Sequence, residues 1–319
     1  MAKSPKTTGT ADPVRDKFTV ALEGLIEQTR RDRSILAAIL CGSLSHDTVW
    51  DKSDIDLLFV TTDDKAPHEN SLCLYADGIN VHVCLLPRAS FRRIAEGAIR
   101  NSFFHSFLAK GRLLYTHDES LATVFDRLKE LGERDNQLQL FAAAAQALPS
   151  VYKARKWLVT RGDLDYTALW ILFSANALAR MEVIEARQLV DREALPQAMK
   201  LNPAFFKLVY TDMLNAKKTR TAVEAALAAI DKYLLDRAET VFAPILEYLA
   251  EVGEARSSTE IEDHFRRNFG IEFSTAACEY LADQGLIGKA PLPVRLTKRS
   301  NIDVQEVAFF RGASPPDVW

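Results

Sequence analysis

The fold of the first part of the chain is decided by two short stretches, Ile39-Leu40-Cys41-Gly42-Ser43 and Asp54-Ile55-Asp56-Leu57-Leu58-Phe59-Val60. The first predicts a buried strand that ends in a tight turn, and the second predicts another buried strand that opens with two acids. In a strand, side chains two residues apart point to the same face of the sheet. Asp54 and Asp56 are therefore expected to project together from the second strand.

Two carboxylates held this close repel each other unless a cation lies between them. Mg²⁺, or Mn²⁺ in its place, suits such a pair because it binds a few carboxylate oxygens together with phosphate oxygens and water. Gly42 lets the backbone approach a phosphate, and Ser43 is expected to cap a short helix whose N–H groups favour an anion. The alternative interpretation is a surface turn with two solvated acids, since acid pairs at this spacing also arise by chance.

The combined pattern resembles that of the nucleotidyltransferase superfamily, which includes polymerase beta and kanamycin nucleotidyltransferase. Its members carry an apolar residue, Gly, and Gly or Ser, followed after a linker by acid, apolar residue and acid. Gly42, Ser43, Asp54 and Asp56 fill these positions in order, and the resemblance covers residues 14–133. It implies that the acid pair holds Mg²⁺ and a nucleoside triphosphate, that the Gly-Ser turn holds phosphates, and that a third carboxylate lies on a neighbouring strand.

The chain departs from the family pattern at one position. The resemblance implies that the third acid should fall at His82, which is a histidine. A hairpin is predicted with strands over residues 72–75 and 79–86, because Asp77-Gly78 is a strong turn signal between two apolar runs. Three interpretations of His82 remain open. It acts as the general base for an acceptor hydroxyl, it is a weak third metal ligand, or the site has lost its chemistry and only binds nucleotide.

The rest of the first domain alternates strands with helices, which predicts an α/β (α+β) nucleotidyltransferase fold with a mixed sheet. Helices are predicted over residues 14–33, 87–99, 101–110 and 118–131, and further strands over 35–41, 54–61 and 111–115. Arg88, Arg92 and Arg93 form a basic cluster on one of these helices. A solvated helix face is the favoured interpretation of this cluster, and contact with phosphate is the minor one.

An all-α helical bundle is predicted over residues 134–250, where apolar residues recur at steps of three and four. The first helix carries its apolar residues from Leu140 to Leu158 and is expected to end at Gly162-Asp163. Further helices are expected over residues 166–181, 191–199, 203–214 and 219–249. Pro149 is expected to kink or restart the first of them. The resemblance implies that a basic residue early in the bundle reaches the triphosphate, and Lys153 and Lys156 are the candidates. A solvated helix face is an equally good interpretation of these two lysines.

A small winged-helix-like domain is predicted over residues 251–319. Ser257 and Glu260 form a capping box that opens a helix, a second helix begins at Ser274, and a strand is predicted over residues 304–310. The second helix carries Glu279 and no Lys or Arg, whereas a DNA-reading helix needs donors for base edges. A packing or protein-contact module is therefore favoured over a DNA reader.

Composition narrows the class of protein. The net charge of −3 over 319 residues argues against broad nucleic-acid binding. Residues 1–13 are polar and are expected to be a disordered tail rather than a secretory signal. The four cysteines form no CxxC pair, which predicts buried free thiols in a reducing cytoplasm and no structural zinc. No membrane association is expected.

Together these observations predict a Mg²⁺-dependent nucleotidyltransferase with Asp54, Asp56 and His82 at its catalytic centre and Gly42, Ser43, Lys153 and Lys156 on the nucleotide. It would move a nucleoside monophosphate, AMP being expected, from an NTP such as ATP to a hydroxyl of a small molecule or a protein. The alternative is a catalytically impaired protein of the same fold that acts as a nucleotide-binding regulator through its winged-helix domain. The expected partners are the nucleotide and an acceptor, and the sequence allows a homo-oligomer.

Overall fold

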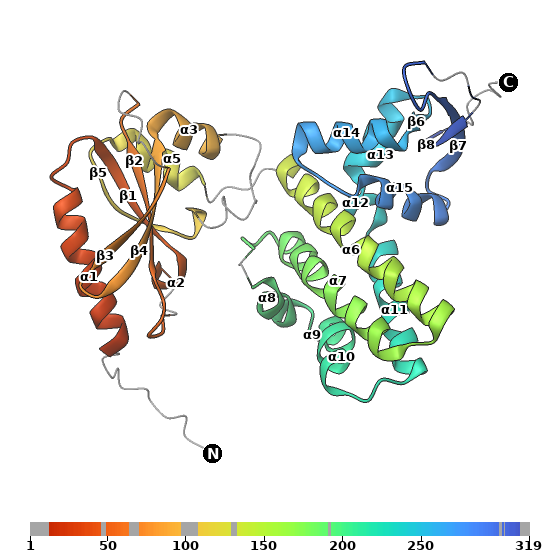
Figure 1. Ribbon diagram of the computed structural model, residues 1–319, viewed down its shortest axis with the longest axis horizontal. Helices are drawn as coiled ribbons and strands as arrows, with labels where there is room; N and C mark the ends of the chain where they lie inside the picture. Colours follow the sequence, from red (N-terminus) through yellow and green to blue (C-terminus); the bar gives the residue numbers. More distant parts are fainter. Residues whose placement is uncertain are drawn as a thin grey trace. The chain divides into compact units, whose positions relative to one another are not determined.

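The chain forms two compact units in the computed structural model, residues 1–130 and residues 131–319 (Figure 1). The structure describes residues 13–45, 49–63, 70–96, 108–128, 133–190, 193–299, 302 and 304–312. Most of the predicted tail therefore lies outside the described residues, as does most of the predicted helix over residues 101–110. Each unit is described by itself below.

The first unit is built on a five-stranded mixed sheet, as predicted. Its strands are β1 (Ile35–Cys41), β2 (Ile55–Thr61), β3 (Ser71–Ala76), β4 (Ile79–Pro87) and β5 (Arg112–Thr116), in the order β3-β4-β2-β1-β5. Strands β2 and β4 run parallel, while the other neighbouring pairs are antiparallel. The parallel pair matters most for the site, because the two strands begin at the same edge of the sheet.

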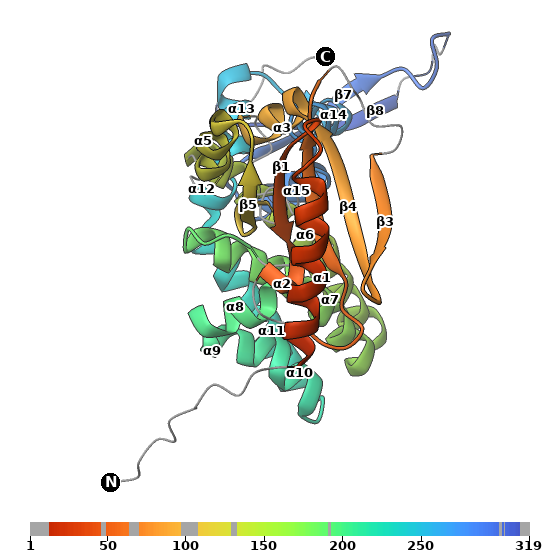
Figure 2. The same cartoon turned by 90° about the vertical axis from the view of Figure 1, so that its left-hand side faces the viewer.

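The helices of this unit cover the two faces of the sheet. They are α1 (Pro13–Thr29), the single turn α2 (Gly42–Ser45), α3 (Arg88–Glu96) and α5 (Glu119–Arg127). Helix α1 lies along one face of the sheet (Figure 2). Its Phe18 and Leu22 belong to the same buried apolar cluster as Leu57 and Val81 of the sheet. Helices α3 and α5 contact each other, and α3 also contacts β2 and β4. Residues of β2 that alternate with Leu57 therefore point away from α1.

The predicted hairpin of β3 and β4 is confirmed. Ala76 pairs with Ile79, so the turn has two residues, Asp77 with a φ of 48° and Gly78 with a φ of 82°. A two-residue hairpin turn whose backbone matches the twist of the flanking strands needs a positive φ at both residues. Along β4, buried and exposed residues alternate, which leaves His82 exposed.

The predicted basic cluster has a structural partner. Nε of Arg88 lies 2.8 Å from Oδ2 of Asp118, and Arg92 donates a hydrogen bond of 2.7 Å to Oγ of Ser120. Asp118 caps the N-terminus of α5 by accepting from the backbone N–H of Ser120. Two of the three arginines thus join α3 to the start of α5, a role that neither interpretation of the sequence anticipated.

The second unit is mostly helical. Its helices before residue 253 are α6 (Glu133–Arg161), α7 (Leu164–Glu185), α8 (Ala194–Leu201), α9 (Pro203–Phe206), the π-helix η1 (Lys207–Thr211), α10 (Asp212–Asn215), α11 (Arg220–Leu235), α12 (Ala238–Val241) and α13 (Ala243–Val252). Pro149 is predicted to kink or restart the first helix; α6 continues through it, so a restart is wrong, while the kink stays a prediction. Pro149 has no N–H to bond the carbonyl of Ala145. The burial of Ala145 and Leu148 nevertheless favours the continuous helix.

The single helix predicted over residues 219–249 is instead divided into α11, α12 and α13. The first break comes after α11, where Arg237 pairs with Glu185 of α7 at 2.8 Å. The second break precedes Pro244, which lies in the first turn of α13, where a proline is tolerated. Apolar periodicity continues across both breaks, which explains why the sequence predicted one helix.

The remainder of the unit contains β6 (Arg256–Ser257), α14 (Ser258–Phe269), α15 (Ser274–Asp283), β7 (Gly288–Val294) and β8 (Val304–Phe310), with the strands in the order β6-β8-β7. The predicted capping box is confirmed, since Ser257 and Glu260 exchange both hydrogen bonds. Phe141 of α6 makes edge contacts with Phe242 and with Phe265 of α14, so this segment and the bundle share one core. The winged-helix resemblance stays a prediction.

Helix α7 is the one described helix that is long and apolar enough, by length and composition, to cross a membrane. The apolar window of this helix is 61% buried inside the unit. Its neighbours α6, α8 and α11 contact it along its length. This burial is what a core helix of a bundle shows, because its apolar residues contact other helices on most sides.

Candidate active site

Three polar side chains meet where β2 and β4 begin. Asp56 is the register partner of His82 in the parallel pair, and Cys41 at the end of β1 is the register partner of Asp56 on the other side. Partners in register point to the same face of a sheet. Asp54 lies two residues before Asp56 and joins them on that face, which is the one opposite α1.

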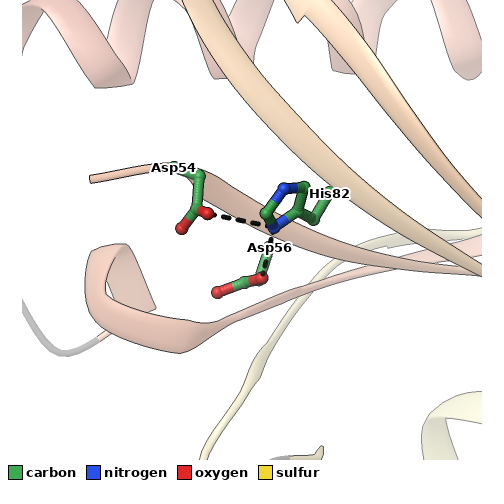
Figure 3. Close-up of side chains that lie close together, drawn as sticks. All are labelled: Asp54, Asp56 and His82. Atoms are coloured by element: carbon green, nitrogen blue, oxygen red, sulfur yellow. Dashed lines mark ion pairs between the residues drawn. The ribbon is translucent and has the colours of Figure 1, made fainter. Parts of the chain in front are cut away.

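The three side chains point toward one another (Figure 3). Nδ1 of His82 lies 2.9 Å from Oδ2 of Asp54 and 3.9 Å from Oδ1 of Asp56. The side chains of His82, Asp54 and Asp56 are 54%, 40% and 29% exposed, respectively. The predicted convergence of the acids with the histidine is therefore present, and a ligand can reach all three from solvent.

The turn after β1 is shaped around Asp56. Gly42 has a φ of +63°, and a Cβ atom added there would overlap the Asp56 carboxylate. Oγ of Ser45 donates a hydrogen bond of 2.7 Å to the carbonyl oxygen of Gly42, which closes the single turn α2. Ser43 is the second residue of α2 and does not precede it, so the capping prediction is wrong. The role of Ser45 was missed, although a serine three residues after a turn glycine is a local signal for it.

Cys41 is buried behind the site. Burial raises the pKa of its thiol well above the usual range, and the charges of Asp56 and Cys84 raise it further. The thiol therefore stays protonated and packs as a small apolar group rather than reacting. All four cysteines are free, but the prediction of burial is wrong for Cys73, which is exposed on the edge strand β3.

The donor set fits a divalent cation. The two carboxylates and the imidazole each offer one ligand atom, and these atoms all lie within 4.8 Å of one another. Ligand atoms around Mg²⁺ lie at about 2.1 Å from the ion, so adjacent ligands are roughly 3 Å apart and opposite ones about 4.2 Å apart. Small side-chain rotations would bring the three atoms to these separations, because the side chains are half-exposed.

A sequence model of the family "Polymerase beta, Nucleotidyltransferase" matches residues 23–120. These residues form a nucleotidyltransferase domain. The matched range contains the Gly42 turn, both acids and His82, so the site described above lies inside the nucleotidyltransferase domain.

A crystal structure of a nucleotidyltransferase-like protein from Exiguobacterium sibiricum resembles the whole chain in fold. The two structures superpose with a TM-score of 0.60 at 17% sequence identity, over 92% of this chain and 99% of that chain. At this identity the likeness shows a shared fold, which extends beyond the nucleotidyltransferase domain into the helical unit. No curated protein sequence matches the chain.

The two lysines predicted to reach the triphosphate lie in the second unit, on the exposed surface of α6. Nζ of Lys153 lies 4.5 Å from the ring centroid of Trp170 on α7, a cation–π contact. Lys156 lies close to one turn further along the same helix. The contact of either lysine with a nucleotide stays a prediction.

Proposed function

We propose that the protein is a metal-dependent nucleotidyltransferase that moves a nucleoside monophosphate, AMP in the first instance, from an NTP to a hydroxyl group. The observation that carries this proposal is the convergence of Asp54, Asp56 and His82 at the start of two parallel strands inside a nucleotidyltransferase domain. Mg²⁺ or Mn²⁺ would be held by Asp54 and Asp56. When bound, such an ion would offset the charge that develops on the transferred group.

The Gly42 turn would hold the phosphates of the nucleotide. Gly42 is half-buried beside Asp56, and the absence of a Cβ atom leaves room for the carboxylate. Ser43 follows directly and offers a hydroxyl and a backbone N–H at the start of α2. Lys153 and Lys156 are proposed to add positive charge toward the triphosphate, as the family pattern implies.

His82 is proposed as the general base. With Nδ1 at 2.9 Å from the Asp54 carboxylate, that nitrogen carries the proton and donates it in a hydrogen bond to Asp54. Nε2 is then the unprotonated nitrogen and is available to the acceptor. A carboxylate that accepts a hydrogen bond from one ring nitrogen of a histidine fixes the tautomer and the orientation of the ring. The other nitrogen is then left to accept a proton.

The acceptor hydroxyl oxygen forms a bond to the α-phosphorus as the bond from that phosphorus to the β-phosphate oxygen breaks. The hydroxyl proton passes to Nε2 of His82, and pyrophosphate leaves. The acceptor is a small molecule or a protein side chain, and both carry hydroxyl groups that meet this requirement.

The direct test is label transfer from α-³²P-ATP and from γ-³²P-ATP in the presence of Mg²⁺ or Mn²⁺ and cell extract. The proposal expects label on an acceptor from the α-labelled nucleotide only, read on gels for proteins and by thin-layer chromatography for small molecules. Asp54→Asn and Asp56→Asn should each lower transfer about a thousandfold, because the metal contributes several kcal/mol. Asp51→Asn, which changes an exposed acid in the adjoining turn, is the matched control and should transfer normally.

A second candidate function is favoured by the imidazole at the position of the third acid. In this case the domain binds nucleotide without transferring it, and the C-terminal segment passes the signal to a protein partner. NTP binding with no transfer to any acceptor would support this regulator. A His82→Asp variant that gains transfer activity would show that the chain has lost a step that its fold can perform.

A further inference from the structure

A separate cavity lies in the second unit, among α6, α11 and α15. Its volume is about 280 Å³, room for about nine waters at roughly 30 Å³ each. Leu148 and Val151 of α6 and Leu234 of α11 form its apolar wall. The remaining lining residues carry polar groups and are Tyr152, Arg155, Asp231, Tyr280, Asp283 and Gln284. These elements are far from the nucleotidyltransferase domain in the sequence, and the proposed reaction uses none of them.

The hydroxyl of Tyr280 is the strongest indication of a ligand. Tyr280 is only 5% exposed, and its buried hydroxyl makes no hydrogen bond with any residue that the structure describes. Burial raises its pKa to about 12, with Asp231 adding to the rise and Arg155 opposing it, so the hydroxyl is neutral at pH 7. Tyr280 and both charged neighbours line the cavity. A buried hydroxyl left without a partner is unfavourable, because it has lost its hydrogen bonds to water and gained none in the protein.

The charges around the cavity leave one acid without a basic partner. Arg155 forms an ion pair with Asp231 across the gap between α6 and α11. Asp283 accepts a long hydrogen bond of 3.4 Å from the Tyr152 hydroxyl, and among the described residues no basic side chain pairs with it. The lining of the cavity therefore includes one exposed carboxylate, that of Asp283, with no basic partner among the described residues, together with Tyr152 and Tyr280. Tyrosine rings also attract cations through their faces.

We propose that this cavity binds a small aliphatic ammonium ion, a protonated primary amine with a short hydrocarbon chain. The ammonium group would donate hydrogen bonds to the Asp283 carboxylate and to the Tyr280 hydroxyl oxygen. The hydrocarbon chain would lie against Leu148, Val151 and Leu234. An anion of the same size is disfavoured by Asp283, and a neutral analogue lacks the charge-assisted hydrogen bond.

The experiment uses three four-carbon probes that share one terminal hydroxyl and carry a cationic, neutral or anionic group at the other end, with the full-length protein at pH 7. These are 4-amino-1-butanol, 1,4-butanediol and 4-hydroxybutyrate, each titrated by ligand-observed NMR and by calorimetry. The expected result is binding of the amine with a dissociation constant of about 1 mM or lower, and no binding of the other two probes. Equal binding of the diol or the acid, or no amine binding at all, would overturn the proposal.

Two variants locate the site. Asp283→Asn should weaken amine binding about tenfold or more, because it removes a charge-assisted hydrogen bond while keeping the shape of the side chain. The matched control is Asp236→Asn, which changes an exposed acid paired with Lys232 outside the cavity. It should bind the amine normally. Amine binding that is the same in Asp283→Asn as in the wild type would place the ligand elsewhere.

Tyr280→Phe supplies a readout that a purely structural hydroxyl would not give. Removing an unpartnered buried hydroxyl should raise the melting temperature of the ligand-free protein. The same change should weaken amine binding, since the ammonium loses an acceptor. A fall in melting temperature together with unchanged amine binding would show that the hydroxyl serves packing alone.

Discussion

The two units of this protein use carboxylates in opposite ways. In the first unit, Asp54 and Asp56 converge with His82 on a surface that is open to solvent. In the second unit, Glu182 of α7 accepts 2.9 Å and 3.2 Å hydrogen bonds from Tyr233 and Asn202. The first arrangement brings two carboxylates and an imidazole together at an exposed edge of the sheet, whereas the second gives its carboxylate two hydrogen bonds from neighbouring side chains. Acids that converge at an accessible edge of a sheet are therefore typical of a functional site. A carboxylate whose hydrogen bonds are already made within the protein is typical of a structural role.

His82→Asn should produce the largest effect that separates the units. We expect transfer to fall about a thousandfold, within the range for loss of a general base, because asparagine cannot accept the proton. The free energy of unfolding should change little, since the His82 side chain is 54% exposed. The measurements are initial rates of label transfer and urea unfolding on the same preparations. Undiminished transfer would remove His82 from the reaction.

Gly42→Ala and Gly253→Ala compare a glycine beside the candidate site with a glycine at the end of a helix in the second unit. Both glycines have a positive φ, so both changes introduce similar backbone strain, but only at Gly42 would the new Cβ atom meet another group, the Asp56 carboxylate. Moving that carboxylate by about 1 Å should lower transfer about a hundredfold. Gly253→Ala should leave transfer unchanged and lower only the stability. Equal transfer rates for the two variants would contradict the role given to the Gly42 turn.

Tyr233→Phe tests the scaffold side of the comparison. Removing the hydroxyl leaves Glu182 short of one donor, which should destabilise the protein by about 1–2 kcal/mol. Burial and the neighbouring Glu182 raise the pKa of Tyr233 well above its usual range, so the hydroxyl is neutral and donates across the whole working pH range. Chemical unfolding measures the change. A variant as stable as the wild type would mean that Glu182 does not depend on this hydrogen bond.

Asp118 at the start of α5 should show the smallest effect, and one that depends on pH. The hydrogen bond from Ser120, together with the nearby Arg88, holds the pKa of Asp118 below its usual value. Because the pKa of Asp118 is lower in the folded protein than in the unfolded chain, the ionised carboxylate stabilises the fold. This contribution is complete above about pH 4 and is lost as the pH falls through the pKa of the folded protein. Asp118→Ala should cost about 1 kcal/mol at pH 7 and less in acid. A cost that is independent of pH between 2 and 7 would contradict the charge-based cap.

Local patterns in the sequence predicted the parts of the fold that local physics determines. The bounds of β1 were predicted to the residue, the Asp77-Gly78 turn was placed correctly, and the capping box at Ser257 was found. The convergence of the acids with His82 was also predictable, because it follows from the two-residue period of strands and from the resemblance to the family. Each of these features depends on residues that are close in sequence or in register.

Features that depend on distant packing were not predictable. Pro149 remains inside α6 because buried neighbours outweigh its missing hydrogen bond, and no local signal reports that burial. The link from Arg88 and Arg92 to the start of α5 joins residues about 30 positions apart. The cavity beside Tyr280 likewise arises from three helices that no periodicity brings together.

Metal binding in solution shows whether Asp54 and Asp56 hold a divalent ion. Mn²⁺ titrated into the wild-type protein, with the free ion followed by electron paramagnetic resonance, should bind one ion per chain and be displaced by excess Mg²⁺. Asp54→Asn and Asp56→Asn should abolish this site, while Asp51→Asn should retain it. Mn²⁺ binding that is absent in the wild type, or equally strong in the two site variants, would contradict the account.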